Sequence, residues 1–239
     1  MQKLHVIGCG GGGGWVIQAL SRMANPEKHI IVLWDGDLVE AKNLDRQLFD
    51  VSAVGFYKSV VWQSKLDIAF KGKCESRTEY LTFAGHVDQF EEGDCIFLCV
   101  DNHAARKNAL MIADAQECRV FNAANEYTDC EAWYYDPGMK DTPCDPRVRS
   151  PELLTDHTGD PLSPCTGLAQ EESPQLALAN MGAAFMAVHL WYLHSTVVCE
   201  KGLNSPEFMC NVPIYHGANF SRMRSLSPRA FNEAEVKNA

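Results

Sequence analysis

Short apolar runs alternate with longer amphipathic stretches through the first half of the chain. Runs of about four to eight apolar residues are typical of buried strands, and longer stretches with one apolar face are typical of helices. The apolar runs predict strands at 3–10, 29–35, 73–81, 94–101 and 119–126. The amphipathic stretches predict helices at 15–24, 58–70 and 102–117. Strands that alternate with helices predict an α/β fold with a parallel, doubly wound sheet and right-handed crossovers.

The amino-acid composition of the chain changes near residue 136. Residues 136–167 are rich in Pro, Asp and Thr, and we expect them to form most of a long loop that ends at residue 173. Long ordered loops in compact domains are usually functional. A long apolar helix is expected from Pro174 to Val198, and 208–217 predicts a closing strand or hairpin. The C-terminal third is therefore expected to be loop-rich.

Composition narrows the classes of function. The chain of 239 residues is long enough for one large domain, and its net charge of −10 disfavours binding to nucleic acid, which needs clustered Lys and Arg. The first predicted strand begins at residue 3, so we expect no signal peptide. The ten cysteines are then expected to be free thiols in the reducing cytoplasm. The apolar run 181–198 contains His189 and His194, so a buried helix is favoured over a membrane span.

A glycine-rich turn, GCGGGGGW, joins the first predicted strand to the first predicted helix. Glycines allow a tight turn and the close approach of an anion, and the helix N-terminus offers free N–H groups to it. A merely permissive turn is the alternative, but five consecutive glycines are costly in chain entropy. The strand–turn–helix context therefore favours nucleotide binding.

Charged and amide side chains follow the second strand in the stretch WDGDLVEAKNLDRQ. Asp35 ends that strand, where nucleotide-binding folds place an acid for ribose hydroxyls. Asn43 and Arg46 follow, and Lys58 begins the next helix. An Arg and a Lys near a phosphate-binding turn suit a triphosphate better than a nicotinamide, because they balance its charge. Surface ion pairing is the simpler explanation for any one residue, but the set favours ATP.

Asp101 lies at the end of the fourth predicted strand, on the edge of the sheet where ligands bind. A carboxylate there could hold Mg²⁺, which usually binds through one or two carboxylates and substrate phosphates. It could equally be the N-cap of the next helix, and both alternatives stay open. An NAD-linked oxidoreductase would also explain the glycine turn and Asp35, but it leaves Arg46, Lys58 and Asp101 without a role.

Together these segments resemble the ubiquitin-activating enzyme superfamily, which includes the ThiF and MoeB adenylyltransferases. The resemblance rests on VIGCGGGGG, IVLWDGDLVEAKNLDRQ, VGFYKS and CIFLCVDNHAAR, within residues 3–135. It implies a single Rossmann-like adenylation domain over 1–239, divided into a nucleotide-binding core (1–135), a long loop (136–173) and a late helix with closing strands (174–239). It also implies a homodimer that uses ATP to adenylate the C-terminal glycine of a ubiquitin-like or sulfur-carrier protein. Within the superfamily, a peptide or a tRNA-borne adenosine is the alternative substrate, and the acidic charge disfavours tRNA.

The resemblance also implies roles for individual residues. Four glycines would line the nucleotide phosphates: Gly8, Gly10, Gly11 and Gly13. Asp35 would bind the ribose. Three residues would bind the triphosphate and the reacting centre: Asn43, Arg46 and Lys58. Asp101 would hold Mg²⁺, so ATP and magnesium are the expected cofactors.

Enzymes of this superfamily often transfer the acyl group from the adenylate to a loop cysteine. Cys165 lies where the resemblance places that nucleophile, ahead of the late helix. Cys144 is the alternative, because Arg147 and Arg149 follow it closely in sequence and would favour a thiolate. His157 in the same loop could assist either cysteine. In a third alternative the enzyme stops at the adenylate.

Two features of some superfamily members have no counterpart in this sequence. Many bacterial members begin with a helix whose Arg completes the partner's site, and no such segment precedes the first predicted strand, so the source of that Arg stays open. The sequence has no CxxC pair, so structural zinc is not expected. A non-catalytic subunit of a heterodimer would be expected to lose several polar site residues, and here all are present.

Overall fold

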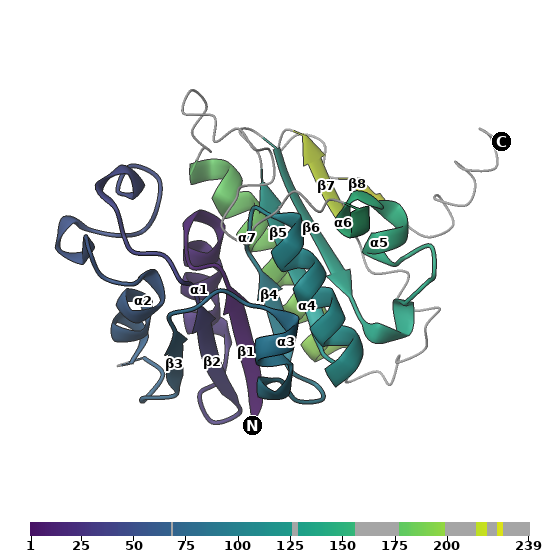
Figure 1. Ribbon diagram of the computed structural model, residues 1–239, viewed down its shortest axis with the longest axis horizontal. Coiled ribbons are helices and arrows are strands. Elements are labelled where there is room, and N and C mark those ends of the chain that lie inside the picture. The colour runs from purple at the N-terminus through teal and green to yellow at the C-terminus, as the bar shows by residue number, and fades with distance from the viewer. Residues whose placement is uncertain (68, 126–128, 156–176, 199–213, 219–223, 227–239) are drawn as a thin grey trace.

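The structure is a computed structural model that describes residues 1–67, 69–125, 129–155, 177–198, 214–218 and 224–226. It is a layered α/β fold in which helices cover both faces of one sheet (Figure 1). The prediction of a Rossmann-like, mostly parallel sheet is confirmed.

In the part of the chain that the structure describes, the sheet has eight strands in the order β3-β2-β1-β4-β5-β6-β7-β8. Its strands are β1 (Gln2–Ile7), β2 (His29–Trp34), β3 (Cys74–Arg77), β4 (Cys95–Leu98), β5 (Arg119–Asn125), β6 (Asp129–Tyr135), β7 (Ile214–Ala218) and β8 (Arg224–Leu226). The first five are parallel, and β6, β7 and β8 each run antiparallel to the preceding strand. The third strand is shorter than the predicted 73–81, and β6 lies in a stretch where we predicted no strand.

Within the described residues, seven α-helices lie around this sheet. They are α1 (Gly11–Met23), α2 (Lys58–Leu66), α3 (Phe83–His86), α4 (His103–Gln116), α5 (Pro146–Arg149), α6 (Glu152–Thr155) and α7 (Ala177–Tyr192). Helix α7 packs on α1, β5 and β6 behind the sheet in Figure 1, whereas α4 lies in front of it and contacts α3 and α6. Short 3-10 turns occur at η1 (Ala41–Asn43), η2 (Val51–Ala53), η3 (Val87–Gln89) and η4 (Pro137–Met139), and η5 (Leu193–Val198) is a π-helical extension of α7.

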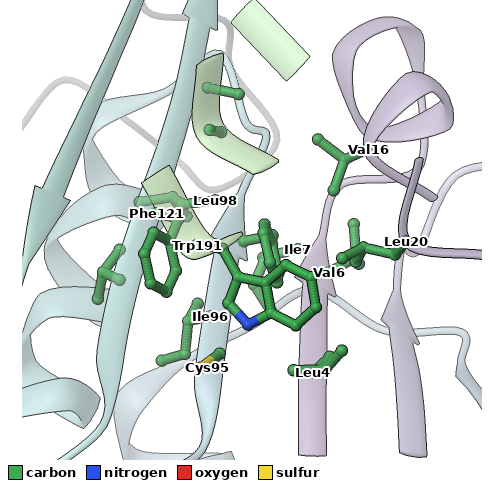
Figure 2. Packing of buried hydrophobic residues seen from close by; sticks show 14 of the residues in the cluster. Leu4, Val6, Ile7, Val16, Leu20, Cys95, Ile96, Leu98, Phe121 and Trp191 are labelled. Atoms are coloured by element: carbon green, nitrogen blue, oxygen red, sulfur yellow. The ribbon is translucent and has the colours of Figure 1, made fainter. Parts of the chain in front are cut away.

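The core forms because strand residues alternate between two covered faces. On one face, the ring of Phe97 lies 6.0 Å from Trp191 of α7 and 5.4 Å from Phe121. Figure 2 shows the Trp191 indole between Phe121 and the side chains of Leu4 and Val6. Truncating such a buried aromatic residue to Ala typically costs about 3–5 kcal/mol.

Most of the apolar run at 181–198 thus belongs to a core helix, as the sequence predicts, and within the described residues this helix is α7, Ala177–Tyr192. Among the helices of the described residues, none has the length and apolar character that a membrane span requires.

Candidate functional site

The glycine turn lies where the direction of winding reverses in the sheet. The chain crosses from β1 to β2 on one side and from β4 to β5 on the other, so the β1–β4 boundary is a topological switch point. Ligands of doubly wound folds bind at such a point, outside the carboxyl ends of the strands. Gly8 follows β1 with a φ of +88°, and a Cβ there would lie 2.6 Å from the carbonyl oxygen of Cys99. Only glycine fits this conformation and this contact without strain.

Helix α1 begins directly on this turn. A Cβ on Gly13 would lie 1.8 Å from the carbonyl oxygen of Gly8, so a glycine is needed for the helix to approach the strand. Gly10 is the N-cap, so no N-cap side chain binds the first amides, and within the described residues the first turn holds no acidic residue. The first amides of α1 are therefore available to an anion, as the nucleotide interpretation requires.

Asp35 holds the glycine turn against the end of β2. One carboxylate oxygen accepts a hydrogen bond from the amide of Cys9 at 2.7 Å, and the other accepts one from the amide of Asp37 at 2.8 Å. Burial raises the pKa of Asp35 above its usual value, and the nearby charge of Lys58 opposes that rise. In this structure Asp35 thus fixes the geometry of the turn, in addition to the ribose contact that the resemblance implies.

Lys58 is anchored by Asp37. Its ammonium lies 2.8 Å from the Asp37 carboxylate, and the Lys58 amide donates to the Asp37 carbonyl at 2.9 Å. The hydroxyl of Tyr80 donates to the other Asp37 carboxylate oxygen. Burial alone would raise the pKa of Asp37, but the hydrogen bonds from Lys58 and Tyr80 lower it below its usual value. The Tyr80 ring also lies 2.8 Å from where a Cβ on Gly36 would be, so this segment packs closely.

Asn43 builds the turn that carries Arg46 and Gln47. Its side-chain carbonyl accepts from the amide of Glu40 at 2.9 Å, and its main-chain carbonyl accepts from the amides of Arg46 and Gln47. Asn43 is buried, so the contacts seen here are structural. The half-buried Arg46 guanidinium makes no hydrogen bond or ion pair with the described part of the chain. The Gln47 amide lies 3.5 Å from the Cβ position of Gly10.

Asp101 is exposed beyond β4, at the same edge of the sheet as the glycine turn. The alternative that Asp101 caps the next helix is wrong, because Asn102 is the N-cap and its side-chain oxygen accepts from the amide of Ala105 at 2.7 Å. The described residues hold no cluster of three or more His, Cys, Asp or Glu that could bind a metal by themselves. A single carboxylate nevertheless fits Mg²⁺, which takes its other ligands from phosphate and water.

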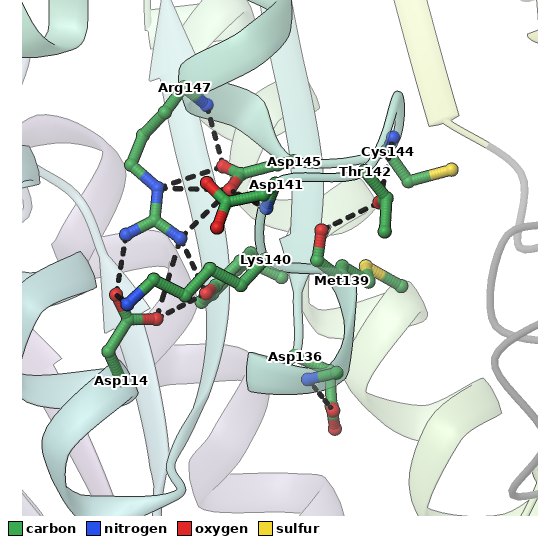
Figure 3. A network of polar contacts seen from close by, with 11 residues as sticks. Asp114, Asp136, Met139, Lys140, Asp141, Thr142, Cys144, Asp145 and Arg147 are labelled. Atoms are coloured by element: carbon green, nitrogen blue, oxygen red, sulfur yellow. Dashed lines mark hydrogen bonds and ion pairs between the residues drawn. The ribbon is translucent and has the colours of Figure 1, made fainter.

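Of the two candidate nucleophiles, only Cys144 lies within the described residues. Cys165 and His157 lie outside the described residues. Cys144 is half-buried, and its amide donates to Thr142. Arg147 donates instead to Asp114 at 2.6 Å and to Asp145 at 2.9 Å, and in Figure 3 the Cys144 thiol points away from its guanidinium. Arg147 is therefore committed to two carboxylates and is not available to stabilise a thiolate at Cys144.

The position of Cys144 in the fold also argues against its acting as the nucleophile at a site on the glycine turn. The Arg147 network holds its segment beside Asp114, in the last turn of α4. Asp114 lies eleven positions after His103, the first residue of α4, which corresponds to about 16 Å along the helix axis. Because α4 runs away from the ligand-binding edge of the sheet, this segment is held away from Gly8.

Four further residues lie at or beside this site, although the sequence alone gave us no role for them. Asp37 and Gln47 belong to the charged stretch after β2 but were not assigned a role, and Tyr80 reaches Asp37 from 43 positions away. Asn180 of α7 lies against Gly11, within 2.7 Å of its Cβ position. Asn180 could have been found, because it is a lone amide within an apolar run.

Comparisons with known proteins agree with this geometry. The model of the ThiF family matches residues 1–189. No curated protein sequence matches the chain significantly. The solved structure of PaaA is similar, with a TM-score of 0.64 and 18% identity, over 95% of this chain and 73% of PaaA.

Two solved structures of Escherichia coli MccB are also similar. One, with AMPCPP and MccA, has a TM-score of 0.60 and 19% identity, and the other, with succinimide, has a TM-score of 0.62 and 18% identity. Each likeness covers 95% of this chain and 63% of MccB, so the chain spans less than two thirds of that protein. At these identities the likeness shows a shared fold.

Proposed function

Because this chain belongs to the ThiF family, we propose that it is an ATP-dependent adenylating enzyme whose site is the switch point between β1 and β4. The observation that carries the proposal is the uncapped start of α1 on the glycine turn, with Lys58 and Arg46 nearby in the same fold. An NAD-linked oxidoreductase is less well supported, since it gives Arg46 and the Lys58–Asp37 pair no role.

The reaction is an in-line displacement. A carboxylate oxygen of the substrate attacks the α-phosphorus of ATP. The bond between this phosphorus and the oxygen that bridges the α- and β-phosphates breaks, and its electron pair leaves with pyrophosphate. The α1 amides at Gly11 and Gly13 bind the phosphates together with Gly8 and Gly10 of the turn, and Asp35 binds the ribose.

The cationic residues of the site stabilise the charge that builds up on the leaving pyrophosphate. Arg46 and Lys58 serve this purpose, and Asn43 positions Arg46 through the turn that it builds. Mg²⁺, held by Asp101, would neutralise further phosphate charge. Little covalent chemistry is asked of the protein, so positioning and electrostatics account for the catalysis.

For the acyl substrate we propose the C-terminal glycine of a ubiquitin-like or sulfur-carrier protein. A peptide is the second candidate, because the similar MccB was solved with MccA. After adenylation, the Cys165 thiolate would attack the acyl carbon and release AMP to leave a thioester. We further propose that the enzyme is a homodimer and acts in the cytoplasm, where ATP is present and thiols stay reduced.

Mass spectrometry tests this proposal. The protein is incubated with ATP, Mg²⁺ and either a ubiquitin-like protein ending in glycine or a short peptide, and the products are examined for an acyl-adenylate and for an acylated enzyme. An adenylate with the first substrate supports the proposal, and acylation lost in Cys165→Ala assigns the nucleophile. Binding of NAD without binding of ATP would show that the assignment of the site is wrong.

A further inference from the structure

Asn180 of α7 is buried against the first turn of α1 without a hydrogen-bond partner. The residue is 0% exposed, and both its side-chain oxygen and its nitrogen lie 2.7 Å from where a Cβ on Gly11 would be. Within the described ranges, neither of these two atoms has a hydrogen-bond partner. A buried, unpaired carboxamide lowers stability, so such groups in folded proteins call for an explanation.

A second amide lies against the same turn. The Gln47 side chain lies 3.5 Å from the Cβ position of Gly10, and its oxygen is buried and also unpaired within the described part of the chain. Two primary amides therefore pack against the N-terminal turn of α1, and within the described residues the N-cap provides no side-chain hydrogen bond to the first amides of that helix. Each primary amide offers two N–H donors without adding charge, which suits an anionic oxygen.

The surroundings of Asn180 are largely apolar, and the side-chain oxygen of Asn125, which also lies near Gly12, forms no hydrogen bond with it. Helix α7 is apolar along its length, and its neighbours Ala179, Ala183 and Ala184 belong to the buried set. Leucine has the same branching of heavy atoms as asparagine and would bury apolar atoms at this position. A ligand bound at this turn would explain the amide.

We propose that Asn180 is a nucleotide-contacting residue, and that its side-chain N–H donates to a phosphate oxygen held at the start of α1. This inference rests on the proposed function, because it takes ATP as the ligand. It adds α7 to the elements that form the phosphate site, which the glycine turn and the charged stretch after β2 alone would not indicate.

Two variants of the full chain test the proposal by calorimetric titration with ATP and with adenosine. Asn180→Leu should weaken ATP binding roughly tenfold, the usual effect of losing one hydrogen bond to a charged group. Asn180→Asp should weaken it further, because it places a carboxylate beside the phosphates. Adenosine, which has no phosphate, should bind the variants and the wild-type protein equally. The Tm of ligand-free Asn180→Leu should rise, because an unpaired amide has been removed.

Asn122→Leu is the matched control. Asn122 is also 0% exposed with both side-chain atoms unpaired within the described residues, but it follows Phe121, which faces α7, so it points to the opposite face of the sheet. It should leave ATP affinity unchanged. Unchanged ATP affinity in both Asn180 variants would overturn this inference alone, whereas a wild-type protein that binds no ATP would overturn the proposed function with it.

Discussion

The ammonium of Lys58 lies 2.8 Å from the carboxylate of Asp37, and Tyr80 donates to the other oxygen of the same carboxylate. Asp37 follows β2 and Lys58 begins α2, so the ion pair joins the two elements that flank the glycine turn on this side. The Lys58 side chain is buried, whereas Asp37 is half-exposed. Asp37 therefore holds the cation in place before a nucleotide arrives.

Replacing Asp37 should affect catalysis more than stability. Asp37→Asn keeps the shape of the side chain but loses the charge, and a partly exposed ion pair contributes about 1 kcal/mol or less to stability. Loss of the anchor should let Lys58 move, and we expect kcat for adenylation to fall roughly tenfold. Steady-state kinetics and urea unfolding of the same variant measure the two effects. Glu27→Gln, which removes the exposed ion pair with Lys71, is the control and should change neither value.

Replacing each of two neighbouring glycines by alanine should change the free energy of unfolding in opposite directions. A Cβ on Gly13 would overlap the Gly8 carbonyl at 1.8 Å, whereas one on Gly12 would meet nothing closer than 3.8 Å. Gly13→Ala should therefore lower the free energy of unfolding by about 2 kcal/mol or more, because the backbone must shift. Gly12→Ala should raise it by about 0.5–1 kcal/mol, because alanine favours the helix. Urea unfolding compares them, and equal effects would show that α1 does not approach the strand as described.

His194 should make stability depend on pH. It is buried on Tyr134, with ring centroids 3.7 Å apart, and burial followed by the nearby charge of Arg119 lowers its pKa from 6.5 to about 4. The unfolded chain thus binds the proton more readily, so the stabilising contribution is present above pH 6.5 and is lost as the pH falls towards 4. The loss should be roughly 2–3 kcal/mol.

His194→Phe keeps an aromatic ring against Tyr134 and removes the titration. Urea unfolding between pH 7 and pH 4 should therefore show a shallower loss of stability in the variant than in the wild-type protein. Parallel curves for the two proteins would contradict the assignment of this pH dependence to His194.

The network in Figure 3 should be structural. Arg147 binds Asp114 and Asp145, and Asp145 is 1% exposed. Arg147→Met leaves the buried Asp145 without its cation and leaves Asp114 with Lys140 alone, so the free energy of unfolding should fall by about 3 kcal/mol. The rate of adenylation by the folded protein should not change, because the network lies beside the last turn of α4. Urea unfolding and activity assays check both, and a loss of activity without a loss of stability would assign this segment to the site.

Much of the fold could be predicted, because apolar strands and amphipathic helices are local patterns. The first five strands and helices α1, α2, α4 and α7 were found, with shifted ends. Strand β6 was not predicted, because its first residues, Asp129 and Glu131, are acidic and its pairing partners lie in other segments. A strand that depends on such pairing has only a weak local signal.

Some residues of the site could likewise be predicted from the sequence, and others could not. The glycine turn and Asp35 carry signals within a few residues, so their placement could be predicted. A lone amide in an apolar run singles out Asn180, but its contact with Gly11, like that of Tyr80 with Asp37, depends on how distant segments pack, and no local pattern identifies these partners. For Asp101 the sequence left two alternatives open, a Mg²⁺ ligand or the N-cap of the next helix. Only the backbone geometry shows that Asn102, not Asp101, is the N-cap.

The most direct test of the central claim is ATP–pyrophosphate exchange with a carrier protein that ends in glycine. It should be measured for the wild-type protein, for Lys58→Met and for Lys71→Met, which removes an exposed lysine far from the glycine turn in sequence. We expect exchange that requires the terminal carboxylate, falls about 100-fold or more in Lys58→Met and is unchanged in Lys71→Met. Equal exchange in Lys58→Met and the wild-type protein would show that the site at the glycine turn does not catalyse adenylation.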